Sequence, residues 1–145
     1  MPITIAGSGT ITGISAGGLP DDCITTAEIA ANAVTYAKIG TTEQGQLCKA
    51  WVNFNGTGTV AIRASYNVSS ITDNGVGDYT VNFTTALADT NYSVVGASGN
   101  VVAQYGAYLL DNSQVRTRTT SAVSVVSYSS SNPLDNQFMN VAIFR

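Results

Sequence analysis

The chain of 145 residues contains no histidine. Histidine titrates near neutral pH, and it activates the nucleophile in Ser-His-Asp and Cys-His sites. Its absence excludes both arrangements and leaves any metal site to carboxylates. The sequence does match the Gly-x-Ser-x-Gly elbow of serine hydrolases at residues 13–17. Because no histidine is present to take the proton of Ser15, we interpret that match as a coincidence.

Charge is also scarce in this sequence. Asp, Glu, Lys and Arg make up 10% of the residues, against about 25% in an average soluble domain. The net charge is -3, with 6 Lys and Arg residues in total. Nucleic-acid binding needs clustered cations that neutralise phosphates, so the composition argues against a nucleic-acid partner. Low surface charge gives weak colloidal solubility, which favours a chain that other subunits cover.

The chain has 2 cysteines, Cys23 and Cys48, and no Cys-x-x-Cys motif. Two cysteines are too few for a disulfide scaffold, so free thiols are the default, and a bridge within or between chains stays open. Long apolar runs are missing as well. The first residues have neither a basic region nor an apolar run of signal-peptide length, and no later run is long enough for a membrane span. We therefore expect no classical export signal and no membrane insertion.

What the sequence does contain is the alternation of an antiparallel sheet. Residues 49–85 form three short runs of alternating apolar and polar residues, separated by Asn-Gly turns at Asn55-Gly56 and Asn74-Gly75. Successive strand side chains point to opposite faces of a sheet. One face of the third run is therefore apolar and the other polar, with Tyr79, Val81 and Phe83 against Thr80, Asn82 and Thr84.

Turn signals divide the sequence after residue 49 into about eight candidate strands. They cover residues 50–55, 58–66, 68–72, 78–85, 91–97, 101–110, 114–128 (one long strand or two short ones) and 137–144. Spacings of about ten residues favour a sandwich or barrel. We predict a mainly β fold in which residues 46–145 form a jelly-roll-like antiparallel β-sandwich.

Two strands of this predicted sandwich have distinctive apolar residues. Residues 138–145 are apolar at most positions of both faces, which predicts a central strand or one covered by another subunit. Trp51, the only tryptophan, begins the first strand. We assign Trp51 to the core, although an aromatic ring on a sheet can also stack on a sugar.

Residues 1–45 lack such alternation, and we interpret them as an extended N-terminal arm with one short helix. Thr25 and Glu28 have the spacing of a capping box, and Gly40 is a natural stop. A helix this short must pack on its own domain or on neighbouring chains, and both options stay open. The candidate oligomer or docking contacts are its larger apolar residues and one alanine: Ile24, Ile29, Ala33, Val34, Tyr36 and Ile39.

Four charged residues are candidates for surface binding. Arg116 and Arg118 project from one face if they lie on a strand, where they can grip a carboxylate or an anionic glycan, or remain a solvated or paired face. Asp73 and Asp78 flank the Asn-Gly-Val-Gly turn, which offers oxygen ligands but lacks the ligand density of a calcium loop. The aspartates are better explained as turn residues than as the catalytic carboxylate pair of a glycosidase. We therefore predict no cofactor, no metal and no catalytic residue.

Two long segments carry a resemblance to a known class of proteins. They are ITIAGSGTITGISAGGLPDDCITTAEIAANAVTYAKI at residues 3–39 and KAWVNFNGTGTVAIRASYNVSSITDNGVGDYTVNFTTALADTNYSVV at residues 49–95. These two segments resemble structural proteins of tailed bacteriophages and prophages, many of which are labelled tail fibre or fibre-like. The proteins of cyanobacterial and marine phages are the most similar. Residues 100–145 share only the general β pattern.

The resemblance implies a virion component that is made in the host cytoplasm and is commonly a homotrimer with an N-terminal attachment region and a C-terminal β domain. In a fibre, the loops at residues 73–78 and 132–136 would touch a host surface glycan. In a capsid decoration (cement) protein, the same arm and sheet would bridge coat subunits, which the short chain favours. A polysaccharide-degrading tail enzyme is the third alternative. Fibre and cement differ in where the arm docks on the other virion proteins.

Overall fold

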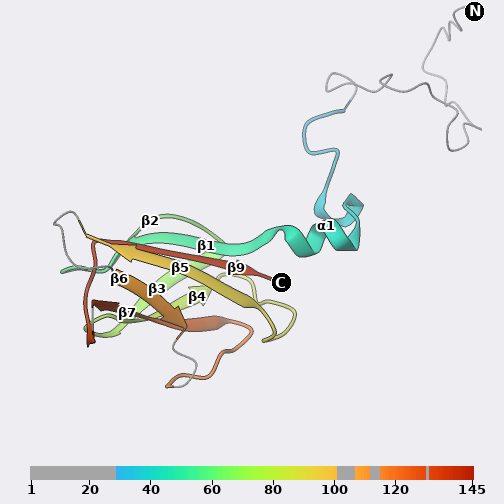
Figure 1. Ribbon diagram of the computed structural model, residues 1–145. Coiled ribbons are helices and arrows are strands. Elements are labelled where there is room, and N and C mark those ends of the chain that lie inside the picture. Colours follow the sequence, from blue (N-terminus) through green and yellow to red (C-terminus); the bar gives the residue numbers. More distant parts are fainter. Residues whose placement is uncertain (1–28, 101–106, 112–114, 130) are drawn as a thin grey trace, which may run out of the picture. The chain divides into compact units, whose positions relative to one another are not determined.

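The computed structural model describes residues 29–100, 107–111, 115–129 and 131–145 (Figure 1). The chain divides into two compact units, residues 1–40 and residues 41–145. This division falls a few residues before the expected boundary between residues 45 and 46. The expected capping box at Thr25 and Glu28, and the candidate contact Ile24, lie outside the described residues.

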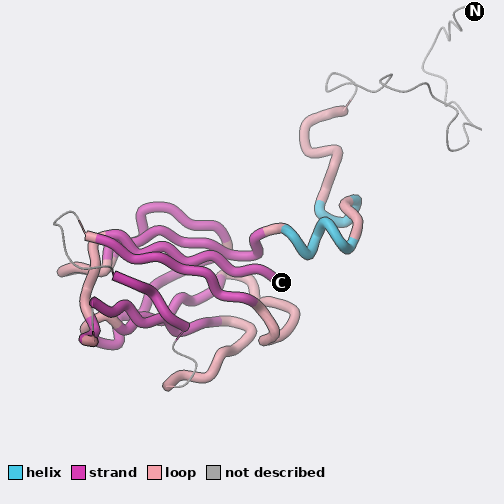
Figure 2. Tube along the Cα trace, viewed as in Figure 1, coloured by secondary structure: helices cyan, strands magenta, loops and turns pink. Residues whose placement is uncertain are grey.

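The second unit is mainly β, as the alternation predicts (Figure 2). Its strands are β1 Cys48–Asn55, β2 Ala61–Tyr66, β3 Val68–Gly75, β4 Asp78–Phe83, β5 Ser93–Gly99, β6 Ala107–Asp111, β7 Ala122–Ser129, β8 Asn132–Pro133 and β9 Phe138–Phe144. Each predicted strand range overlaps one of them. The two-residue β8 was not predicted from the sequence, and the part of the range 101–110 before Ala107 lies outside the described residues.

The strands form two antiparallel sheets that lie in two layers (Figure 1). Sheet A has the order β2-β1-β9-β5, and sheet B has the order β3-β4-β7-β6, with β8 paired to β7. The hairpins β1–β2 and β3–β4 each stay within one sheet, whereas the chain changes sheet between β2 and β3, β4 and β5, β5 and β6, and β8 and β9. The prediction for the C-terminal strand is confirmed, because β9 lies centrally between β1 and β5.

Apolar residues of both sheets fill the space between the layers. Sheet A contributes alternate residues of β1 and β9, and sheet B contributes those of β4 and β7: Ala50, Val52, Phe54, Met139, Val141, Ile143, Tyr79, Val81, Phe83, Val123 and Val125. The rings of Phe54 and Tyr79 meet edge to face across the layers, with centroids 5.2 Å apart. The prediction that Tyr79, Val81 and Phe83 share a buried face is confirmed.

A hydrogen-bond network closes one end of the sandwich. The buried Tyr79 hydroxyl lies 2.6 Å from Oδ1 of Asp135 and 2.8 Å from the carbonyl oxygen of Gly56. Burial and the Asp135 carboxylate raise the pKa of this phenol far above its usual value. A Cβ at Gly56 would lie 2.7 Å from the Tyr79 hydroxyl, so the glycine permits this close approach. Gly58, and not Gly56, takes the positive φ of this loop.

Two local predictions were wrong. Residues 115–121 contain no strand, because Thr119 Oγ1 accepts hydrogen bonds from the amides of Ser121 and Ala122 and turns the chain there. The second error concerns the helix expected to stop at Gly40. Residues 29–40 contain only a 3-10 turn, η1 (Tyr36–Lys38), because Asn32 takes φ 64° and Thr35 is extended. The short helix α1 (Thr41–Gln46) begins after Gly40 instead.

Candidate functional site

The four charged residues predicted to bind a surface partner are engaged within the domain. Arg116 forms an ion pair with Asp78, with 3.3 Å between Nη2 and Oδ2. Arg118 pairs with Asp111 and donates to the carbonyl oxygen of Tyr92 at 2.7 Å. Neither arginine lies on a strand, so the two guanidinium groups do not project together from one sheet face as expected. Oδ1 of Asp73 accepts the Gly75 amide at 3.0 Å, which makes it a turn residue.

The two loops expected to reach a glycan hold each other in place. Oδ1 of Asp135, in the loop before β9, accepts the amide of Gly77 at 2.7 Å as well as the Tyr79 hydroxyl. A Cβ at Gly77 would lie 2.6 Å from the carbonyl oxygen of Ser127, so a larger residue does not fit there. These contacts give Asp135 a structural role at the loop end of the sandwich.

Over β3 and β4 the outer face of sheet B is polar, and its side chains bond to one another. We call it the B face and define it by Ser70, Thr72, Asn74, Thr80 and Asn82. Asn82 Nδ2 donates to Ser70 Oγ at 3.1 Å and to Thr72 Oγ1 at 3.0 Å. Asn74 Nδ2 donates to Thr80 Oγ1 at 2.9 Å. Because each amide is used inside the sheet, this face offers a ligand few unpaired donors.

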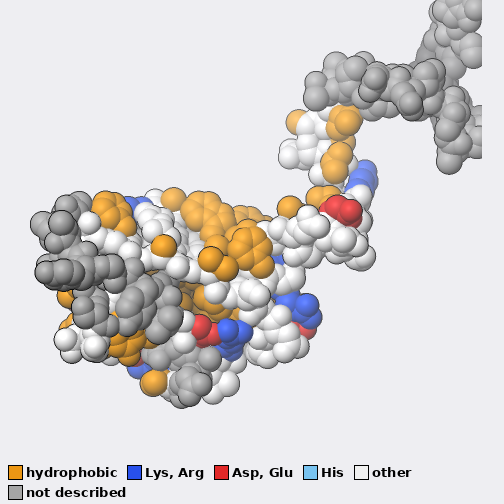
Figure 3. All heavy atoms as spheres, viewed as in Figure 1, with side chains coloured by type: hydrophobic (Ala, Val, Ile, Leu, Met, Phe, Trp, Pro, Cys, Tyr) orange, Lys and Arg blue, Asp and Glu red, His pale blue; other side chains and the backbone are white. Residues whose placement is uncertain are grey.

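The outer face of sheet A presents apolar and aromatic side chains to solvent (Figure 3). We call it the A face and define it by Trp51, Asn53, Tyr66, Val95, Asn140 and Ala142. Strand register places four of these residues in one row across the sheet, in the order Tyr66, Trp51, Ala142 and Val95. The side chains of Trp51, Tyr66 and Val95 are 40%, 59% and 57% exposed. Exposed apolar surface of this kind marks interaction sites.

The A face is hollowed between its larger side chains. A hollow of about 380 Å³ lies over β1, β9 and β5, and Trp51 and Val95 border it while Gly96, Ala97 and Ala142 keep its floor low. At its floor the amides of Asn53 and Asn140 meet, with 2.7 Å between Nδ2 of Asn53 and Oδ1 of Asn140. The residues that line it carry no charge. The hollow therefore combines an apolar wall with an amide pair.

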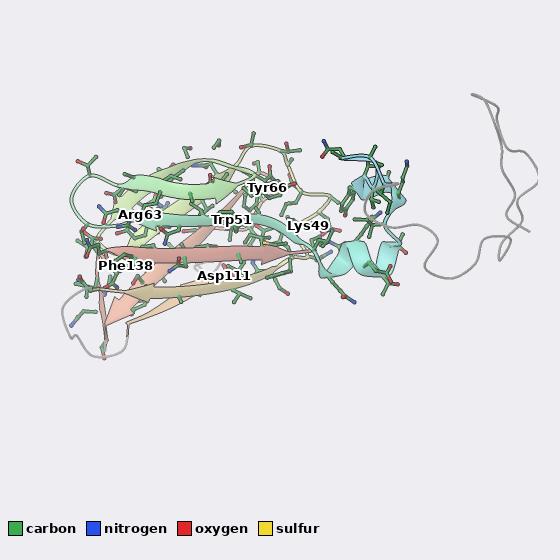
Figure 4. All side chains as sticks on the ribbon, turned by 90° about the horizontal axis from the view of Figure 1, so that it is seen from above. Lys49, Trp51, Arg63, Tyr66, Asp111 and Phe138 are labelled. Carbon is green, nitrogen blue, oxygen red and sulfur yellow. The ribbon has the colours of Figure 1, made fainter. Side chains whose placement is uncertain are left out.

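A cation lies at one end of the A face. The guanidinium carbon of Arg63 is 4.9 Å from the ring centroid of Phe138, within the range of a cation–π contact. Figure 4 views sheet A from above and shows Arg63 and Phe138 at one end, with Trp51 and Tyr66 farther along the same face. The ring of Phe138 is 40% exposed, so it extends the apolar surface.

The assignment of Trp51 to the core was wrong. The neighbouring Ala50 and Val52 are buried between the sheets, and alternation turns the indole to the outer side. The alternation of β1 could have revealed this, because Trp51 lies on the same face as the polar residues Lys49, Asn53 and Asn55. Tyr66 was missed for another reason: all residues of β2 are exposed, so this edge strand has no buried face to identify.

Five of the six candidate docking contacts, all except Ile24, lie on the described residues 29–40. Ile29, Val34 and Tyr36 are exposed, and Ala33 and Ile39 are partly exposed. Lys38 closes the segment on itself, because its Nζ donates to the carbonyl oxygen of Ala33 at 3.0 Å. Three apolar side chains of a short segment are therefore accessible to a partner.

Neither the described residues nor the comparisons with known proteins assign a function to the chain. Within the described ranges, no three His, Cys, Asp or Glu side chains gather as metal ligands. No helix in the described part of the chain is long and apolar enough to cross a membrane. Comparisons with protein-family models, with curated proteins and with solved structures found no match.

Proposed function

We propose that this chain is a non-enzymatic structural protein of a bacteriophage particle. In this proposal it is a short trimeric tail fibre of the adhesion type, which docks through residues 1–45 on other virion proteins and presents the β-sandwich. The resemblance of residues 3–39 and 49–95 to phage structural proteins supports the setting. The exposed A face is the observation that carries the role, because an apolar surface around an uncharged hollow suits contact with a partner.

The N-terminal residues supply the attachment in this proposal. They form a separate compact unit, and Ile29, Val34 and Tyr36 are exposed on it. Deleting residues 1–40 is therefore expected to leave the sandwich folded, with an unchanged circular dichroism spectrum, and to abolish incorporation into particles. Incorporation of the truncated chain at the normal level would contradict the attachment role. Loss of the β spectrum would show that residues 1–40 belong to the core of the domain.

Particle composition tests the fibre role directly. Quantitative mass spectrometry of purified particles is expected to find this chain at a small fraction of the copy number of the coat protein, and antibody labelling is expected to place it on the tail. Light scattering of the free protein is expected to give the mass of three 15.0 kDa chains. A copy number comparable with the coat protein, with label over the capsid, would replace the fibre role with capsid decoration.

The non-enzymatic part of the proposal has its own test. The pure protein is expected to leave the viscosity of host capsular polysaccharide unchanged during incubation. A steady fall in viscosity would contradict it and favour a polysaccharide-degrading tail enzyme. Substitution of Asp73, Asp78 or Asp135 would then show which carboxylates act, since glycoside hydrolysis uses a pair of them.

A further inference from the structure

We infer that the A face is a binding site for a neutral glycan, with Trp51 and Tyr66 as the stacking platform. The inference deepens the adhesion function proposed above and rests on it for the biological source of the ligand. It assigns the contact to the face of sheet A, whereas the sequence had suggested the loops at residues 73–78 and 132–136.

The two rings are neighbours in one row of the sheet, and Tyr66 lies on the side of Trp51 that is away from the hollow. Trp51 on β1 and Tyr66 on β2 are register partners, so their Cα atoms lie directly opposite each other and their side chains share one face. Both carry a polar group, the indole N–H and the phenol O–H, beside a large apolar surface. A pyranose has the matching form, since one side of its ring presents C–H groups while hydroxyls surround the rim.

The floor of the hollow supplies hydrogen bonds for such a rim. The contact between Asn53 and Asn140 uses one N–H of Asn53 and the side-chain oxygen of Asn140. An asparagine side chain has two donors and an acceptor with two lone pairs, so the pair retains the Asn53 oxygen and the Asn140 amino group for a ligand. Small residues beside the pair, Gly96 and Ala97, allow a flat ring to approach.

Charge selects the class of glycan. The lining residues of the hollow are all uncharged, and its volume of about 380 Å³ suits one or two sugar units. The two cations of sheet A, Lys49 and Arg63, lie beyond the lining of the hollow, toward opposite ends of the face (Figure 4). An acidic sugar seated in the hollow would therefore lose its hydration there without a cation in the lining to replace it. A neutral hexose polymer therefore fits better than a uronic acid polymer.

Trp51 is both the platform and the reporter, because it is the only tryptophan in the chain. The full chain is titrated with maltohexaose, cellohexaose and laminarihexaose, and its tryptophan fluorescence is followed. At least one of these neutral oligosaccharides is expected to change the emission saturably, whereas oligogalacturonate is not. If none of the neutral oligosaccharides changes it, or if only the acidic one does, the inference is wrong.

Variants locate the site by a second method, isothermal titration calorimetry. Trp51→Ala is expected to weaken binding by roughly tenfold or more, as for an aromatic anchor, and Trp51→Phe by less. Asn140→Ala should also weaken binding, while Val76→Ala, an exposed apolar residue of the β3–β4 turn, serves as the matched control and should have no effect. Equal loss in all variants, or none in Trp51→Ala, would overturn the assignment.

A second copy of this chain is the competing occupant of the A face. In that case the emission would shift with protein concentration in the absence of sugar, and Trp51→Ala would lower the oligomer mass in light scattering. Either result would overturn the glycan site. Failure of glycan binding is distinguishable from failure of the proposed function, because antibody labelling of particles reports the virion role without any sugar.

Discussion

The outer faces of the two sheets use similar residue types in opposite ways. On the B face, Asn82 and Asn74 donate to hydroxyls of neighbouring strands, so the polar groups satisfy one another. On the A face, Asn53 and Asn140 bond only as a pair beside the exposed rings of Trp51 and Tyr66. A polar sheet face can thus satisfy its own hydrogen-bonding groups, while a less polar face keeps groups available for a ligand.

The largest difference is expected between the two sides of β1. Phe54→Ala removes a buried ring that meets Tyr79 and should cost about 3–5 kcal/mol of unfolding free energy, because the core cannot fully collapse around the cavity. Trp51→Ala removes a half-exposed ring and its cross-strand contact and should cost about 1 kcal/mol. Urea denaturation of both variants measures the difference. Similar losses would mean that the A face is part of the fold and not reserved for a partner.

We expect Asn82 on the B face to matter for stability and Asn53 on the A face to matter for glycan binding. Asn82→Ala breaks three contacts with Ser70 and Thr72 and should cost about 1–2 kcal/mol, since their hydroxyls lose a partner. Asn53→Ala breaks one exposed contact and should cost about 0.5 kcal/mol. Thermal unfolding and glycan calorimetry on both variants check this. The reverse pattern, with Asn53 important for stability and Asn82 for binding, would break the comparison.

Much of this fold could be predicted from the sequence, because alternation is a local property of a strand. The buried set Tyr79, Val81 and Phe83 and the central place of β9 both followed from the pattern. Strand order could not, since the pattern does not say which strands become neighbours. Trp51 was assigned to the core by residue type, against the parity of its own strand. Arg118 was assigned to a surface because a strand was expected there, whereas it lies in a loop and pairs with Asp111.

Salt should affect the A face little. Its lining is uncharged, so the dissociation constant for a neutral oligosaccharide is expected to change less than about twofold between roughly 0.1 and 1 M salt, where the screening length falls from about 10 to about 3 Å. Calorimetry at the two salt concentrations measures it. A steep weakening with salt would point to Arg63 or another cation as the main contact.

The smallest effect is expected at the exposed pair of Asp89 and Arg145, at the C-terminal end of the chain. Hydrogen bonds from Arg145 hold the pKa of Asp89 below its usual value. A carboxylate whose pKa is lower in the folded state stabilises the fold at pH values above its unfolded pKa, which is about 4. This contribution disappears as the pH falls through the pKa of the folded state.

The Asp89→Asn variant should therefore melt slightly below the parent protein at pH 7. The two melting temperatures should converge in acid, at a pH below the lowered pKa of Asp89. Melting curves across this range provide the check. A difference that stays constant down to low pH would contradict a role for the charge of Asp89.

The most direct test of the central claim is an amide NMR titration of the full chain with the neutral oligosaccharide that changes the Trp51 emission most. The account predicts shift changes that centre on Trp51, Asn53, Tyr66, Val95 and Asn140, with the B face unaffected. Shift changes centred on Thr72, Asn74, Thr80 and Asn82, or on the loops at residues 73–78 and 132–136, would contradict it.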